Sequence, residues 1–136
     1  MSLVLDASLT MAWCFESEAN GYTDEILARM EQGEEAFVPT LWRLEVVNAL
    51  LKAKRQGRIT GERAAEFLAQ LRGFAIEVDG EAPVKADNKI FQLGLKHQLS
   101  SYDAAYLELA MRRKLPLATQ DNNMIAAAKA MAVSRV

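Results

Sequence analysis

Two acidic residues of this sequence, Asp6 and Asp121, stand just beyond short apolar runs of the kind that form buried parallel strands. Asp6 directly follows Leu3–Leu5, and Asp121 comes two residues after Leu117–Thr119. In open α/β sheets, ligands bind where the carboxyl ends of the strands form one edge. Carboxylates gathered at such an edge are suited to holding a cation.

Two further acids, Glu45 and Asp103, lie on predicted helices. Asp103 falls in the first turn of a helix over residues 101–113, capped by Ser100 or Ser101, where the helix dipole favours an ionised carboxylate. Glu45 belongs to a helix over residues 41–56. The inner side of that helix is predicted to carry Leu41, Leu44, Val47, Asn48 and Leu51. A charge on Glu45 would interrupt this side and would need partners.

The chemistry expected of these acids is divalent metal binding. Taken singly, Asp103 and Asp121 have ordinary structural roles, as a helix cap and a turn residue. A cluster of four carboxylates is different, because their repulsion raises the pKa of some of them unless a cation lies between them. Oxygen ligands favour Mg²⁺ or Mn²⁺. Cys14 and His97 are the only cysteine and histidine, which excludes a zinc site built from several such residues and the histidine pair of many metal-free ribonucleases.

The chain as a whole has the size and composition of one globular domain over residues 1–136, with 51% hydrophobic and 25% charged residues. Its N-terminal apolar run is too short for a signal peptide, and no stretch predicts a membrane span. We therefore expect a cytoplasmic protein. The net charge of −2 neither favours nor excludes RNA as a partner. If the four candidate metal ligands are set aside, 14 of the 18 acidic residues remain against 16 basic residues.

The elements that must position these acids alternate along the chain. Apolar runs predict strands at 3–5, 36–38, 75–78 and 115–119, and a candidate edge strand at 133–136. Helical spacing predicts helices that begin at the caps Thr23, Thr40 and Thr60, and further helices over 84–99, 101–113 and 122–131. This alternation indicates an α/β sandwich around a parallel sheet.

Four stretches carry a family resemblance: Val4–Ser8, Leu44–Leu50, Ser101–Tyr106 and Leu117–Asp121. In order and spacing they resemble the four signature segments of PIN-domain nucleases, especially the VapC toxins, over essentially the full chain. The resemblance implies a three-layer α/β/α sandwich with a central, mostly parallel sheet. It also implies metal-dependent cleavage of RNA to 5′-phosphate and 3′-hydroxyl ends, a cognate antitoxin and a homodimer.

The resemblance also implies roles for the acids. Asp6 and Asp103 match metal ligands, while Glu45 and Asp121 complete the quartet directly or through water. Some relatives carry a further acid just beyond the fourth position, where this chain has Asn122–Asn123, so we expect any second metal ion to be bound weakly.

Smaller polar and basic residues surround these positions. Ser8, Asn48 and Thr119 match positions expected to orient carboxylates, hold water or touch the phosphate. The candidate phosphate contacts are Lys52, Lys54, Arg55 and Arg58 on one helix end, and Arg112, Arg113 and Lys114 on another. Positive residues at helix ends also complement the dipole, so both explanations stay open.

Other features allow two interpretations each. Trp13 and Trp42 lie among apolar neighbours, which favours the core over base stacking. His97 lies near a helix end, where a structural or surface role is expected. Apolar positions on the helices from Thr23 to Arg55 and from Thr60 to Arg72 are explained equally by core packing and by a groove for an antitoxin segment.

The sequence features allow three functions. The first is a toxin ribonuclease inhibited by a partner protein, and the second is a housekeeping RNA-processing nuclease of the same fold. The third is a non-catalytic RNA- or protein-binding module. The presence of all four acids disfavours the third, because a binding module has no need of an uncompensated carboxylate cluster.

Overall fold

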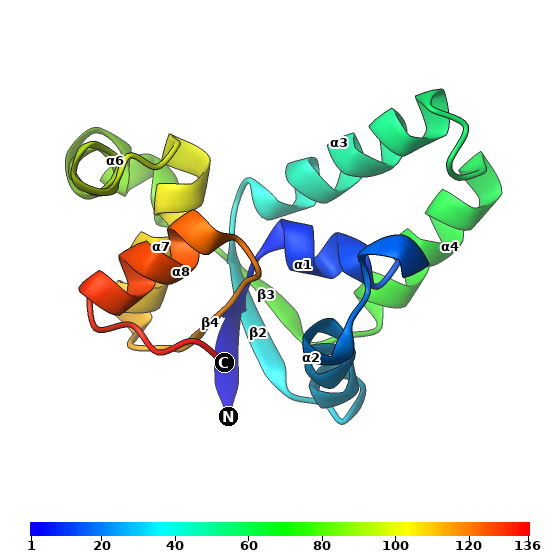
Figure 1. The fold of residues 1–136 in the computed structure, drawn as a ribbon, viewed down its shortest axis with the longest axis horizontal. Helices are drawn as coiled ribbons and strands as arrows, with labels where there is room; N and C mark the ends of the chain where they lie inside the picture. Colours follow the sequence, from blue (N-terminus) through cyan, green and yellow to red (C-terminus); the bar gives the residue numbers. More distant parts are fainter.

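A computed structural model describes residues 1–136 and has a four-stranded sheet at its centre (Figure 1). The strands are β1 (Ser2–Leu5), β2 (Glu35–Pro39), β3 (Ile76–Asp79) and β4 (Leu117–Ala118). They are arranged in the order β3-β2-β1-β4, and every pairing is parallel. Leu3, Val4 and Leu5 are fully buried, as expected for the central strand of a sheet covered on both faces.

Helices cover both faces of the sheet (Figure 1). On one face lie α1 (Ala7–Ala12), α2 (Gly21–Glu31), α3 (Trp42–Arg55) and α4 (Gly61–Arg72), with a short 3₁₀ turn, η1 (Glu16–Glu18), between the first two. The other face carries α5 (Ala82–Lys85), the π-helical segment η2 (Ala86–Ile90), α6 (Phe91–His97), α7 (Ser101–Arg113) and α8 (Asn122–Ala130). The prediction of a three-layer α/β/α sandwich is confirmed, with a sheet that is entirely parallel.

The core is centred on β1 and α7. Residues 104–110 of α7 are all buried, and this helix packs against both β1 and β2. Its period of 3.6 would allow an exposed face, but α8 and α6 cover the sides that the sheet leaves free. The position of α7 is therefore fixed from several directions.

Two helix starts differ from the predictions. Helix α2 is capped by Asn20, whose side chain accepts from the Thr23 backbone N–H at 3.0 Å. Thr23 returns a hydrogen bond to Asn20, which makes a capping box rather than a cap at Thr23. Helix α3 begins at Trp42 after Leu41, with no side-chain cap, so Thr40 does not cap it. The caps at Thr60 and Ser100 are confirmed.

The buried face of α3 also differs from the prediction. Its buried residues are Trp42, Val46, Leu50 and Ala53. Leu44, Val47 and Leu51, assigned to the inner side, are instead 74%, 37% and 53% exposed. Both sets share the helical period, and periodicity does not distinguish a core face from an exposed apolar face.

Two C-terminal predictions need adjustment. The helix expected over 84–99 starts earlier, at Ala82, and consists of α5, the π-helical η2 and α6, which ends at His97. The candidate edge strand at 133–136 forms only one isolated bridge to the sheet, between Leu117 and Arg135. None of the helices is both long enough and apolar enough to cross a membrane.

Candidate functional site

The first part of the site forms where β1 and β4 end side by side. Parallel pairing of Leu5 with Ala118 places Asp6 next to Thr119. Asp6 is only 5% exposed, and its Oδ2 accepts hydrogen bonds from Ser8 Oγ at 2.7 Å and Thr119 Oγ1 at 2.9 Å. The predicted orienting roles of Ser8 and Thr119 thus have matching contacts, which hold the Asp6 carboxylate in one orientation.

Asp121 also serves the backbone around it. It is the N-cap of α8, and its Oδ1 accepts from the Met124 backbone N–H at 3.0 Å. Its own N–H donates to Thr119 Oγ1 at 3.1 Å, so Thr119 connects Asp121 to Asp6. Asp121 therefore has a structural role, as a helix N-cap rather than the turn residue considered from the sequence, and one of its two oxygens is engaged in it.

Asp103 lies in the first turn of α7 but is not its cap. Ser100 fills that role, since its hydroxyl accepts from the Asp103 backbone N–H at 3.1 Å. The structural explanation for the Asp103 carboxylate is therefore removed. Its position brings it within electrostatic range of Asp6 and Asp121.

Glu45 lies in the first turn of α3 and is half-buried. Its Oε1 accepts a 2.6 Å hydrogen bond from the hydroxyl of Tyr106 on α7. Sequence reasoning missed Tyr106, although its spacing of three residues from Asp103 places the two on one face of a helix. Asn48 is exposed and has no hydrogen bond to the acids, so its predicted role stays a prediction.

The charges of the four acids act on one another. Burial raises the pKa of Asp6, and the charge of Asp121 adds to this against the hydrogen bonds from Ser8 and Thr119. Burial likewise raises the pKa of Glu45, where Asp6 and Asp103 add repulsion, and that of Asp103, where Asp6 and Asp121 do. The acids thus share one region of negative potential, which a cation would relieve.

The donor chemistry of this region fits a hard divalent cation. All candidate ligands are carboxylate oxygens, which Mg²⁺ and Mn²⁺ prefer. The structure does not bring three Asp, Glu, His or Cys side chains within joint reach of one ion. Mg²⁺ usually keeps several bound waters and takes only one or two carboxylates from the protein, so a site with fewer than three protein ligands is compatible with this ion.

A groove leads away from the acids between α1 and α3. It has a volume of about 490 Å³, and Ser8 and Glu45 line it together with Lys52 and Arg58. Arg58 lies 4.5 Å over the ring of Phe15 and makes an exposed 3.4 Å ion pair with Glu18. Lys52 makes no ion pair, which leaves its charge available to a ligand.

The second basic cluster is already occupied. Arg112 donates to both oxygens of Asp79, at 3.0 and 2.8 Å, and to Glu108, while Arg113 donates to Asp79 at 2.7 Å. These contacts hold the pKa of Asp79 well below its usual range, with the hydrogen bond from Arg112 as the largest cause. Of the two explanations left open for Arg112 and Arg113, these contacts favour the structural one. Their hydrogen bonds to Asp79 connect the C-terminal end of α7 to β3.

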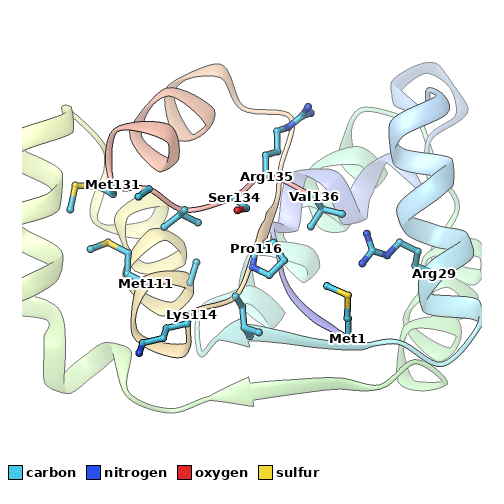
Figure 2. Close-up of a pocket in the computed structure, with 13 residues that line it drawn as sticks. Met1, Arg29, Met111, Lys114, Pro116, Met131, Ser134, Arg135 and Val136 are labelled. Atoms are coloured by element: carbon cyan, nitrogen blue, oxygen red, sulfur yellow. The ribbon is translucent and has the colours of Figure 1, made fainter.

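The largest hollow of the molecule lies away from the acids (Figure 2). Met1 and Pro116, which precede β1 and β4, line it, so it belongs to the opposite edge of the sheet. Its volume is about 600 Å³. Of its basic residues, Arg29 is paired with Glu34 at 2.9 Å and Arg135 donates to the Thr119 carbonyl and stacks on Tyr22. No acid lines this hollow, so it lacks the chemistry of the carboxylate site.

Fold and site together define an α/β protein with an acidic site at the carboxyl edge of a parallel sheet. The family model of the PIN domain matches residues 3–130. Ribonuclease VapC3 of Pyrobaculum aerophilum is 33% identical over 126 residues, which cover 91% of this chain and 92% of that relative. The chain therefore belongs to the PIN-domain family.

Solved structures share the fold. A crystal structure of a Pyrobaculum aerophilum protein has a TM-score of 0.71 at 23% identity and covers 93% of this chain and 84% of its own. FitAcB from Neisseria gonorrhoeae has a TM-score of 0.62 at 16% identity, with coverages of 99% and 96%. A toxin–antitoxin complex from Klebsiella pneumoniae has a TM-score of 0.60 at 14% identity, with coverages of 91% and 90%.

Proposed function

We propose that this protein is a metal-dependent endoribonuclease, the toxin of a toxin–antitoxin pair that acts in the cytoplasm. The observation that carries the proposal is the convergence of Asp6, Glu45, Asp103 and Asp121 on one region where their charges repel one another. Such an arrangement is costly without a cation and useful with one. The similarity to a protein named as a ribonuclease supports RNA as the substrate.

In this proposal Asp6 and Asp103 are the principal ligands of Mg²⁺ or Mn²⁺, and Glu45 and Asp121 complete the site directly or through water. The ion, when bound, supplies the Lewis acidity that polarises the scissile phosphate and makes a water molecule more acidic. The protein supplies position. Ser8 and Thr119 keep the Asp6 carboxylate oriented through their hydrogen bonds to Oδ2.

The groove beside Glu45 is the proposed path of the RNA backbone. Lys52 and Arg58 line it together with Ser8 and Glu45 of the candidate site. Phosphates bound by the basic residues would lead the strand towards the acids. Stacking on Phe15 keeps the guanidinium of Arg58 in place, and its 3.4 Å ion pair with Glu18 is exposed, so a phosphate is able to compete for this charge.

Two protein partners complete the proposal. The similar complex from Klebsiella pneumoniae contains an antitoxin, which supports a cognate antitoxin for this chain. The exposed apolar residues Leu44 and Leu51 on α3, and Phe91 and Leu95 on α6, provide surface for a homodimer. Both helices extend beyond the same edge of the sheet, so one interface is able to use both (Figure 1).

The decisive experiment uses purified protein and a mixed RNA pool with Mg²⁺, Mn²⁺ or EDTA, beside an Asp6→Asn variant. We expect cleavage only with metal and only by the unmodified protein, because the variant loses a central ligand with almost no change in volume. Cleavage that survives both EDTA and the substitution would overturn the metal mechanism. Growth arrest on expression without a partner, relieved by coexpression of a small neighbouring open reading frame, separates a toxin from a housekeeping nuclease.

A further inference from the structure

Tyr106 is the largest fully buried side chain of the protein. A phenol hydroxyl in such a place must find a partner, since an unsatisfied buried hydroxyl costs about 1–3 kcal/mol. Its partner is Glu45 Oε1, at 2.6 Å. This is also the one hydrogen bond that the structure gives the Glu45 carboxylate.

The contact joins two helices across the site. Tyr106 and Asp103 are three residues apart on α7 and share a face. Glu45 belongs to α3, 61 positions away from Tyr106 in the sequence. One face of α7 thus supplies an acid to the cluster and a hydrogen-bond donor to a second acid.

We propose that Tyr106 is a positioning residue, which holds the Glu45 carboxylate beside the acids that bind the metal ion, where Glu45 acts on the ion directly or through a bound water. The inference rests on the proposed metal-dependent function. Held by one oxygen, Glu45 keeps its second oxygen for the ion. Without Tyr106, repulsion from Asp6 and Asp103 would turn the Glu45 side chain towards solvent, which it reaches because it is only half-buried.

The chemistry of the phenol suits this role. The phenol hydroxyl donates to Glu45 Oε1 at 2.6 Å, the separation of a charge-assisted O–H···O⁻ hydrogen bond. This bond fixes one oxygen of a carboxylate that has no other hydrogen-bond partner. A tyrosine that merely filled the core would give neither effect, and phenylalanine would replace it without consequence.

The test compares the unmodified protein, Tyr106→Phe, Glu45→Ala and the double variant, with Tyr102→Phe as the matched control, because alanine removes the acceptor that glutamine would keep. Tyr102 lies on the same helix, but it is 62% exposed and its hydroxyl makes no hydrogen bond. Mn²⁺ binding is measured by titration calorimetry, and kcat and KM by cleavage of an RNA oligonucleotide. We expect Tyr106→Phe to weaken Mn²⁺ binding about tenfold or more and to lower kcat with little change in KM. The double variant should be no worse than Glu45→Ala alone.

A Tyr106→Phe variant with unchanged Mn²⁺ affinity and kcat would overturn the proposal, as would losses that multiply in the double variant. Thermal unfolding of the same four proteins in EDTA provides a measurement that does not depend on metal. Non-additive shifts in melting temperature would show that Tyr106 holds Glu45, and additive shifts would contradict it. If the unmodified protein neither binds Mn²⁺ nor cleaves RNA, the proposed function fails, while this coupling still decides the role of Tyr106.

Discussion

Asp6 and Asp79 are two buried carboxylates at the ends of parallel strands, with 5% and 3% of their surface exposed. The charged groups next to the two carboxylates have opposite signs. Asp6 has Asp121 in its neighbourhood, and burial raises its pKa. Asp79 accepts from Arg112 and Arg113, which lower its pKa. We therefore predict that the same substitution, Asp→Asn, has opposite effects on stability at the two positions.

The expected magnitudes follow from these contacts. Asp79→Asn leaves two guanidinium groups without their shared counter-charge, and breaking a buried pair in this way costs about 3–5 kcal/mol. The lower end, about 3 kcal/mol, is expected because Glu108 keeps its bonds to Arg112, whose side chain is 27% exposed. Asp6→Asn removes a charge that the folded state disfavours. Such substitutions in functional sites commonly stabilise by about 0.5–2 kcal/mol, and about 1 kcal/mol corresponds to roughly 4 °C in Tm for this size.

The assay is thermal and urea unfolding in EDTA between pH 3 and pH 8. The pKa of Asp6 is raised in the folded protein, so the folded state favours the protonated carboxyl group. The stability that this group contributes is present at low pH and is lost as pH rises through the pKa of the folded protein. The gain from Asp6→Asn should therefore appear above the ordinary value of 3.8 and be largest near neutral pH. A lowered folded pKa means that Asp79 stabilises above 3.8 and that this stability is lost as pH falls towards the folded value. The deficit of Asp79→Asn should be complete at pH 7. If Asp6→Asn lowers Tm in EDTA at pH 7, as Asp79→Asn does, the reasoning about the acid cluster is refuted.

Three further predictions address metal, RNA and assembly. Saturating Mn²⁺ should raise Tm more at pH 8 than at pH 5, and less in Asp6→Asn than in the unmodified protein; equal shifts measured by scanning fluorimetry would argue against the carboxylate site. Lys52→Ala and Arg58→Ala should raise KM for RNA, leave kcat nearly unchanged and each reduce the salt slope of binding by about 0.7. Lys54→Ala, outside this groove, is their control, and a fall in kcat alone would contradict the proposed path. Leu44→Asp should convert a dimer into a monomer in sedimentation experiments without loss of Tm, since this side chain is 74% exposed; an unchanged dimer would exclude this surface.

Much of the fold was predictable because the local pattern and the tertiary structure agree. Leu3–Leu5 forms an apolar run because β1 is covered on both faces, and Ser100 caps α7 where the helical spacing begins. Helix α2 was misplaced by three residues because Asn20 and Thr23 are both good cap residues and form a reciprocal pair. Local chemistry does not decide between two such candidates.

The orientation of α3 was not predictable from its apolar residues. The helix carries two apolar stripes, and only contacts with α1 decide that Val46 and Leu50 are buried while Leu44 and Leu51 are exposed. The apolar pattern marks Glu45 because a charge there would interrupt the predicted inner side of α3. In the structure that side is largely exposed, while Glu45 is half-buried and accepts a hydrogen bond from Tyr106. The reason drawn from the pattern is therefore wrong, and the role of Glu45 in the site stays a prediction.

The ion pair between Arg112 and Asp79 was likewise not predictable from the sequence. Asp79 is 33 positions away from Arg112 and lies on another element. Asp79 follows the strand predicted over 75–78, as Asp6 follows the one over 3–5, so position alone would make it a candidate for the acidic site. What separates the two carboxylates is the sign of the charge that the fold places beside each. Neighbours of this kind are known only once the elements are packed.

The four acids share a feature that follows from the topology. Asp6 and Asp121 are the N-cap residues of α1 and α8, and Glu45 and Asp103 lie in the first turns of α3 and α7. In a parallel sheet, helices that follow a strand, such as α1, α3 and α8, start at the carboxyl edge, and so does α7, which leads back to the start of β4. Their dipoles favour negative charge, which makes a cluster of carboxylates tolerable. Burial, with added repulsion between the acids, nevertheless raises the pKa values of Asp6, Glu45 and Asp103. The fold therefore holds the acids together at a cost in electrostatic free energy, and a bound divalent cation would offset this cost.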